Sequence, residues 1–234
     1  MVSKNSFLDH LFKLDEVLRR TRQAGLKINA KKSFFARSEL ECLGCWVTRK
    51  GIQPMPKKVD AMMRLEEPKT RKQLRGFIGV VNYYRDMWKH RSHALAPLTA
   101  LTSTSIPWKW GEEQSKAFQE AKKILSKEAL LAFPVFDKPF IMRADASHRQ
   151  LGAVVSQNGH PIAFHSRKLN DAQTRHATAE RELLSIVETL KELRVILLGH
   201  KTVAWTDHKN LTHNDLKSER VLRWRLLMEE HSPD

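Results

Sequence analysis

The feature that most constrains the fold is a series of short apolar segments in the second half of the chain. Brief polar turns separate the first three, which is typical of strands joined as hairpins. In order, the pattern predicts strands at 139–145, 150–157 and 160–166, a helix at 178–197, a strand at 201–207 and a helix at about 216–230. It therefore predicts an α/β domain in which three strands, a helix and a fourth strand follow one another.

Three acids hold distinctive places in this pattern. Asp145 ends the first strand, Asp207 ends the last one, and Glu182 lies at the end of the first turn of the helix, with Thr178 as its N-cap. If the two strands are parallel neighbours, both aspartates emerge at one edge of the sheet, and a helix laid across the sheet delivers Glu182 there. Converging carboxylates repel one another unless a hard divalent cation lies between them, and Mg²⁺ fits best. Taken singly, a strand-terminal Asp is usually a turn residue and a first-turn Glu usually favours the helix dipole, so the prediction rests on the three acids as an ordered set.

The charge of the chain is concentrated in its first part. The net charge is +15. Residues 1–136 hold 26 Lys and Arg against 13 Asp and Glu, a net +13, whereas residues 137–234 hold 15 against 13, a net +2. A basic surface on a folded domain attracts phosphate backbones. We therefore expect a polyanionic partner, with a merely solubilising surface as the alternative.

The first part predicts a mixture of helices and short strands. Residues 6–25 suit an amphipathic helix that stops at Gly25. After Thr70, which forms a capping box with Gln73, a helix is expected to run to about Trp88. The remaining expectations are strands in "LKI", "SFF" and "LECLGCWV" with a turn at Arg49-Lys50-Gly51, a helix from Pro56 to about Leu65, an irregular stretch at 91–111 and a helix from Glu112 to Lys127.

Several classes of protein are excluded by what the sequence lacks. No apolar stretch reaches the roughly 18 residues that a membrane-spanning helix needs, and the N-terminus has no signal-peptide core. We therefore expect an intracellular protein without a membrane partner. The two cysteines, Cys42 and Cys45, rule out a disulfide framework. Their C-x-x-C spacing leaves a redox pair or half of a zinc site as alternatives to a plain strand.

Several motifs together resemble the polyproteins of gypsy-type long-terminal-repeat retroelements. "RADASHRQLGAVVSQ", "HPIAFHSRKLNDAQ", "ATAERELLSIVETLKELR" and "WTDHKNL" resemble their ribonuclease H domain. Upstream, "AGLKINAKKSFF", "ECLGCWVTRKGIQPMPKKV", "KTRKQLRGFIGVVNYYRDMW" and "WKWGEEQSKAFQEAKKIL" resemble the end of the reverse transcriptase palm and the thumb. The resemblance covers nearly the whole chain and keeps the family's order.

The resemblance implies a nuclease. The family's first three ribonuclease H acids fall on Asp145, Glu182 and Asp207, which are then both catalytic residues and metal ligands. The implied reaction is hydrolysis of the RNA strand of an RNA/DNA hybrid with two Mg²⁺ ions, for which Mn²⁺ is a substitute. Arg143 and Arg149 either hold phosphate or are exposed solubilising residues.

The resemblance also implies a nucleic-acid interface in the first part. Arg75, Gly79 and Tyr83 share one face of the helix after Thr70, which resembles the thumb surface that follows a duplex minor groove. The alternative is that Gly76 and Gly79 serve helix packing. Leu43 and Gly44 lie in "CLGCWV", which resembles the hairpin that positions the primer terminus. An ordinary core hairpin is the alternative there.

We therefore expect an α+β palm remnant with a primer-grip-like hairpin at 1–55, a helical thumb and connector at 56–130, and an α/β ribonuclease H-like domain with a mixed sheet at 131–234. The family's Tyr-x-Asp-Asp box would precede the chain, so we expect no polymerase activity. The last strand and the last helix of the family's ribonuclease H domain, which bears a fourth acid, would follow the chain. We therefore expect a nuclease domain that lacks this strand and this helix. The functional alternatives are an inactive nucleic-acid-binding remnant and a basic scaffold without a specific ligand. The sequence carries no prediction of oligomeric state.

Overall fold

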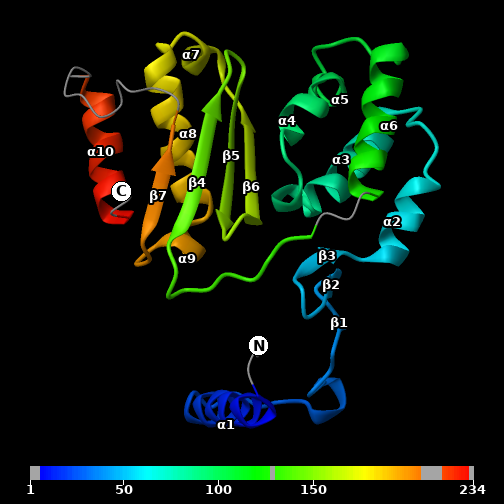
Figure 1. Ribbon diagram of the computed structural model, residues 1–234. Helices are drawn as coiled ribbons and strands as arrows, with labels where there is room; N and C mark the ends of the chain where they lie inside the picture. Colours follow the sequence, from blue (N-terminus) through cyan, green and yellow to red (C-terminus); the bar gives the residue numbers. More distant parts are fainter. Residues whose placement is uncertain (1–5, 127–129, 207–217, 232–234) are drawn as a thin grey trace.

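The computed structural model describes residues 6–126, 130–206 and 218–231 (Figure 1). Helix α1 spans Phe7–Gln23, with the Ser6 side chain accepting from the backbone N–H of Asp9, and it ends before Gly25 at φ +70°. In the described part of the chain none of its residues is buried, so its apolar stripe faces solvent. The helix predicted at 6–25 is confirmed, and it lies apart from the rest of the molecule in Figure 1.

The strands expected in "LKI" and "SFF" are wrong. Residues 26–28 and 33–35 are not in strands, and a single 3-10 turn, η1 (Ala30–Lys32), lies between them. The Asn29 side chain accepts a hydrogen bond from the backbone N–H of Lys31 at 3.0 Å and starts that turn. Asparagine often competes with strand pairing in this way, because its side chain offers the backbone a local partner.

A small antiparallel sheet follows, made of β1 (Leu40–Cys42), β2 (Cys45–Val47) and β3 (Ile52–Pro54) in the order β1-β2-β3. The apolar run expected as one strand is therefore two strands, which turn at Leu43 and Gly44 with φ +46° and +68°. The expected turn near Gly51 is present between β2 and β3. Gly51 is required there, because a Cβ on it would lie 2.1 Å from the carbonyl oxygen of Leu131.

The helical part comprises α2 (Pro56–Met63), α3 (Arg71–Tyr83), the 3-10 turn η2 (Arg85–Met87), α4 (Arg91–Ala94), α5 (Ala96–Ala100) and α6 (Glu112–Ser126). One apolar cluster joins these helices, with Leu74, Val81, Leu98 and Phe118 fully buried. Thr70 caps α3 as expected, but the Gln73 side chain accepts from the N–H of Lys69 instead of Thr70. Two expectations are wrong: α3 stops at Tyr83, five residues before Trp88, and the stretch expected to be irregular contains α4 and α5.

The second sheet has the strand order β6-β5-β4-β7. Its strands are β4 (Phe140–Ala146), β5 (Gln150–Gln157), β6 (His160–Lys168) and β7 (Thr202–Trp205), and its helices are α7 (Asp171–Thr174), α8 (Thr178–Glu192), α9 (Arg194–Leu197) and α10 (Glu219–His231). β4, β5 and β6 are antiparallel neighbours, whereas β4 and β7 are parallel, so the expected mixed sheet is present. Helix α8 covers one face, with α10 beyond it (Figure 1).

A polar joint connects the helical part to the second sheet. Its members are Arg91 and Ser92 from α4 and Gln150 and Ser166 from β5 and β6. The Ser92 hydroxyl lies 2.7 Å from both Gln150 Oε1 and Ser166 Oγ, and the Arg91 guanidinium donates to the Ser166 carbonyl oxygen at 3.1 Å. Nothing in the sequence pattern predicted this joint, because its partners are 58 to 75 residues apart.

Candidate active site and nucleic-acid interface

The end of β4 brings two of the predicted acids together. Asp145 is exposed and is paired with Gly152 across the β4–β5 ladder. Glu182, on α8, is 7% exposed, and its Oε1 accepts a hydrogen bond of 3.0 Å from the backbone N–H of Ala146. The carboxyl group of Glu182 therefore reaches the residue next to Asp145, as a helix laid across the sheet was expected to do.

Ser185 fastens α8 to the same place. Its side chain is fully buried, and its hydroxyl lies within hydrogen-bond distance of the carbonyl oxygens of Asp145, at 3.3 Å, and Gly152, at 3.0 Å. Ser185 lies one helical turn after Glu182, so both residues project onto the sheet. One turn of α8 thus holds the Glu182 carboxylate and the backbone of Asp145 in a fixed relation.

The start of α8 differs from the expectation. The N-cap is Ala177, which makes no side-chain cap, and Thr178 is the first helical residue. Glu182 therefore lies in the second turn, and the first-turn acid is Glu180. Burial raises the pKa of Glu180, but the hydrogen bonds and charge of Arg220 outweigh it, so the pKa lies below its ordinary value. Glu180 is thus occupied by an ion pair with α10, which leaves Glu182 as the acid at the sheet edge.

The third predicted acid, Asp207, lies outside the described residues. β7 runs parallel to β4, with Trp205 opposite Arg143, and this parallel pairing was the condition stated for Asp145 and Asp207 to share an edge. Within the described ranges no group of three His, Cys, Asp or Glu residues is placed to hold a metal ion. The described part of the site consists of Asp145 and Glu182.

The contact of Arg181 with the β4–β5 turn, beside these acids, was not predicted. Arg181 precedes Glu182, and its guanidinium lies 3.3 Å from the Ser147 carbonyl oxygen and 3.2 Å from His148 Nδ1, in the β4–β5 turn. Arg143 lies over the exposed ring of Trp205, 5.9 Å from its centroid. The sequence placed Arg143 and Arg149 near Asp145, but the contact between Arg181 and the turn depends on where α8 begins.

The helix α3 and the β1–β2 hairpin form one surface. Arg75, Gly79 and Tyr83 are all exposed on one face of α3, as predicted. The hydroxyl of Tyr83 donates to the carbonyl oxygen of Leu43, and that of Tyr84 donates to Gly44 at 2.9 Å. The five residues assigned to nucleic acid from the sequence therefore include a contacting pair, Tyr83 and Leu43. We call the surface of Leu43, Gly44, Arg75, Gly79 and Tyr83 the α3 face.

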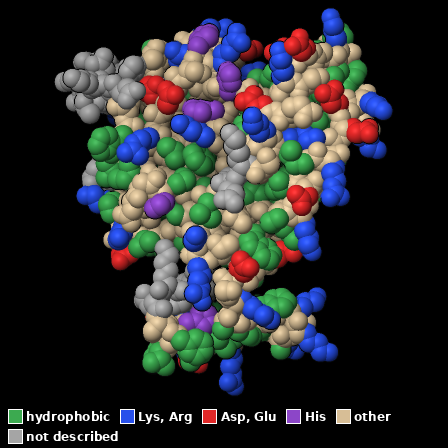
Figure 2. All heavy atoms as spheres, turned by 45° about the vertical axis from the view of Figure 1, so that its right-hand side comes forward, with side chains coloured by type: hydrophobic (Ala, Val, Ile, Leu, Met, Phe, Trp, Pro, Cys, Tyr) green, Lys and Arg blue, Asp and Glu red, His purple; other side chains and the backbone are tan. Residues whose placement is uncertain are grey.

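The described structure bears on the alternatives for these residues. A Cβ at Gly76 or Gly79 would meet no heavy atom within 4 Å, so no described segment packs closely against either glycine. Leu43, in the turn, is 85% exposed, whereas Cys45 in β2 packs against the apolar cluster of the helices. Arg75 is held by a hydrogen bond of 2.6 Å from its guanidinium to the carbonyl oxygen of Thr102. Figure 2 shows Lys and Arg side chains spread over the visible surface and around α1 at the bottom, with no single continuous stripe.

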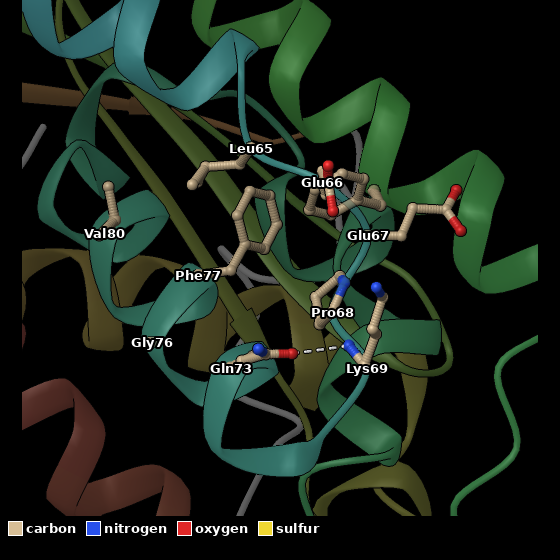
Figure 3. Close-up of a pocket in the computed structure, with 10 residues that line it drawn as sticks. Leu65, Glu66, Glu67, Pro68, Lys69, Gln73, Gly76, Phe77 and Val80 are labelled. Carbon is tan, nitrogen blue, oxygen red and sulfur yellow. Dashed lines mark hydrogen bonds between the residues drawn. The ribbon is translucent and has the colours of Figure 1, made fainter.

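A pocket of about 480 Å³ lies beside the α3 face (Figure 3). Its walls come from the α2–α3 connection and from α3 and α6. They include Leu65, Phe77, Val80 and Phe118, and in Figure 3 the Gln73 side chain is bonded to the backbone of Lys69 at the rim. The pocket contains neither Asp145 nor Glu182. It is therefore separate from the candidate active site.

Comparison with known families identifies the second part of the chain. Residues 110–204 match the family described as the RNase H-like domain found in reverse transcriptase. The chain contains an RNase H-like domain of the reverse transcriptase type. This domain includes the whole of β4, β5, β6 and α8, and hence Asp145 and Glu182.

Related sequences extend beyond the RNase H-like domain. The chain is 35% identical, over 99% of its length, to the retrovirus-related Pol polyprotein from transposon opus of Drosophila melanogaster. It is 33% identical, over 96%, to that of transposon gypsy from the same organism, and 30% identical, over 98%, to the Tf2-3 polyprotein of Schizosaccharomyces pombe. The chain spans only 25%, 23% and 18% of these polyproteins. The relationship inferred from the motifs is confirmed.

Solved structures show the same fold. The foamy viral protease-reverse transcriptase in complex with RNA/DNA hybrid has a TM-score of 0.79 and 22% identity, covering 99% of this chain and 33% of that chain. The dRH form in complex with double-stranded DNA has a TM-score of 0.78 and 22% identity, covering 99% and 43%. The likeness therefore includes α1, the small sheet and the helices as well as the RNase H-like domain. None of the helices in the described ranges is long and apolar enough to cross a membrane.

Proposed function

We propose that this chain supplies the RNase H activity of a retroelement reverse transcriptase and hydrolyses the RNA strand of RNA/DNA hybrids. In this proposal residues 1–55 are the end of the palm, 56–130 the thumb and connector, and 131–234 the RNase H-like domain. The observation that carries it is the hydrogen bond that brings Glu182 to the end of β4, beside Asp145. The relatives over nearly the whole chain support the wider assignment.

The residues present fit a hard divalent cation. Asp145 exposes its carboxylate, and Glu182 has one oxygen engaged with the Ala146 N–H, which fixes the direction of the group. We propose that Asp207, two residues after Trp205, completes an all-oxygen ligand set of the kind Mg²⁺ and Mn²⁺ prefer. When bound, the metal ions activate water and stabilise the leaving oxygen. Ser185 and the Ala146 N–H position the acids, and Arg181 and His148 supply positive charge or hydrogen bonds to an adjacent phosphate.

The α3 face is proposed to hold the duplex while the acids act on it. The solved relatives of this fold are complexes with an RNA/DNA hybrid and with double-stranded DNA. Gly79 leaves the backbone of α3 open to close approach, and Arg75 and Tyr83 flank it with a donor and an aromatic ring. The excess of positive charge in residues 1–136 adds a sequence-independent attraction for phosphates.

Cleavage of a labelled hybrid tests the proposal. The chain is expected to cut the RNA strand in Mg²⁺ or Mn²⁺ but not in a chelator, and Asp145→Asn is expected to abolish cutting while hybrid binding persists. Asp137→Asn is the matched control, because it removes an exposed acid just before β4. Cutting that survives Asp145→Asn undiminished would contradict the assignment. Binding without any metal-dependent cutting would instead favour the inactive nucleic-acid-binding alternative.

A further inference from the structure

The β1–β2 hairpin places the two cysteines of the chain directly opposite each other. Cys42 ends β1, Cys45 begins β2, and the two are paired across the turn. Both turn residues, Leu43 and Gly44, have positive φ, which is the two-residue turn that best matches the twist of paired strands. Residues paired in this way project their side chains to the same side of the hairpin. The two thiols therefore share one face.

The spacing of the pair suits a disulfide. Opposed residues in antiparallel strands have Cα atoms about 4.5–5.5 Å apart, and disulfides join Cα atoms about 4.4–6.8 Å apart. Both cysteines are free thiols in this structure. An S–S bond between Cys42 and Cys45 therefore requires rotation of the side chains and a small closing of the hairpin, because opposed Cβ atoms are about 4.5–5.5 Å apart and those of a disulfide about 3.5–4.5 Å apart.

Contacts from outside the hairpin hold this arrangement. Tyr83 and Tyr84, at the end of α3, donate their hydroxyl hydrogens to the two turn carbonyls, those of Leu43 and Gly44. Leu43 adopts the left-handed region, which is unfavourable for a residue with a Cβ, so the turn depends on such contacts. Gly44 has φ +68° and lies close to Lys58 and Tyr83, so glycine is the residue that suits this position of the turn.

The two thiols are not equivalent. Cys42 is exposed, whereas Cys45 is partly buried and packs against the apolar cluster of the helices. Burial raises the pKa of the Cys45 thiol, although the nearby ammonium of Lys58 acts in the opposite direction. A dissolved oxidant therefore meets Cys42 first, and Cys45 is placed to react second.

We propose that Cys42 and Cys45 are a modification site that forms a reversible intramolecular disulfide with a low-molecular-weight disulfide such as oxidised glutathione. The Cys42 thiolate attacks the glutathione disulfide, forms a mixed disulfide and releases one glutathione thiolate. The Cys45 thiol then loses its proton to solvent, attacks the Cys42 sulfur and releases the second glutathione. Two protein thiols are oxidised to one disulfide, and one glutathione disulfide is reduced to two thiols. In a reducing compartment the pair rests as the dithiol.

The disulfide has a consequence at the α3 face, and this step rests on the proposed function. The turn places Leu43 beside Tyr83, so its conformation is part of that face. A bond between Cys42 and Cys45 holds the turn independently of the tyrosine hydroxyls. Oxidation is therefore expected to leave hybrid binding intact and to restore it in Tyr84→Phe, where one of the two hydroxyl contacts is lost.

Equilibration of the chain in glutathione buffers of varied ratio, followed by thiol alkylation and mass spectrometry, tests the site. The oxidised chain is expected as a monomer lighter by two hydrogen atoms and protected from alkylation at both cysteines, whereas Cys42→Ser and Cys45→Ser each yield at most a mixed disulfide. Tyr84→Phe is expected to lower the equilibrium constant for disulfide formation roughly three- to tenfold, the factor that one net hydrogen bond contributes.

Four results would count against the proposal. If both thiols still alkylate in excess oxidised glutathione, or if the product is a disulfide-linked dimer, the intramolecular bond is wrong. An unchanged equilibrium constant in Tyr84→Phe would show that α3 does not hold the pair. Hybrid binding is then measured on reduced and oxidised Tyr84→Phe. If oxidation does not restore binding in this variant, the proposed effect of the disulfide on the α3 face is wrong. If neither redox state of the unsubstituted chain binds hybrid, the proposed function fails while the disulfide result stands.

Discussion

Replacing Ser185 with alanine is expected to destabilise the RNase H-like domain by about 1–2 kcal/mol. The Ser185 hydroxyl is fully buried and serves the carbonyl oxygens of Asp145 and Gly152, at 3.3 and 3.0 Å. Its removal takes away one donor, worth roughly 0.5–1.5 kcal/mol, and leaves two buried acceptors with one partner fewer. Loss of a single oxygen atom creates little empty volume, so the packing contribution is small.

Urea unfolding at constant pH measures this difference. The midpoint is expected to fall while the slope against urea concentration stays the same, because the surface exposed on unfolding is unchanged. Ser126→Ala is the matched control, since it removes a hydroxyl that bonds to a carbonyl in an exposed last turn of α6. Its effect is expected to stay within about 0.5 kcal/mol.

A change below that size in Ser185→Ala would refute the view that this hydroxyl fastens α8 to the sheet. The same variant tests the link between stability and function. Because Ser185 ties the turn after Glu182 to the backbone of Asp145, its loss is expected to weaken Mn²⁺ binding at the two acids as well. Lower stability with unchanged metal affinity would mean that the Ala146 N–H alone positions Glu182.

Arg75→Ala is expected to weaken hybrid binding about fivefold, which corresponds to one net hydrogen bond of about 1 kcal/mol, and to reduce the salt dependence of binding. A salt titration measures both effects, with Arg64→Ala as the control because it removes the same charge elsewhere. Burial lowers the pKa of His165, so as pH falls the histidine of the unfolded chain is protonated before that of the folded chain. The free energy of unfolding is therefore expected to keep its full value above the ordinary histidine pKa near 6.5 and to fall below it. His165→Gln should reduce that fall when unfolding is measured from pH 7.5 to about 5. Ser92→Ala is expected to destabilise the joint by about 1–2 kcal/mol, and an unchanged unfolding midpoint would show that the joint contributes nothing to stability.

The elements with the clearest periodicity were predictable from the sequence. Strand β5 was expected at 150–157 and occupies Gln150–Gln157, because an apolar run bounded by turn residues at both ends leaves little choice. Helix α6 was expected from Glu112 and begins there. The strands expected near Ile28 and Phe35 failed for the opposite reason: no pairing partner exists for them in the described structure, and Asn29 starts a turn between them.

The part of the candidate site that follows from the order of strands and helices along the chain was predictable. Asp145 and Glu182 were placed together from a strand end and a helix start, and in the structure Glu182 accepts from the N–H of Ala146, the residue after Asp145. The contact between Arg181 and His148 was not foreseen, because it depends on α8 beginning after Ala177 with Thr178 inside the helix. A shift of one residue at a helix start rotates each side chain by about 100°, which is enough to change its partner.

The polar joint connects the helical part, which carries the α3 face, to the β4–β5 turn that follows Asp145. Ser92, from the helical part, bonds to Gln150, and Gln150 accepts from Ser147 within the β4–β5 turn that follows Asp145. The same turn receives Arg181 from α8. These contacts form a continuous series from α4 through Gln150 and the β4–β5 turn to α8. The helical part is therefore joined directly to the acid-bearing edge, and under the proposed function this joint is expected to orient a duplex on the α3 face relative to the acids.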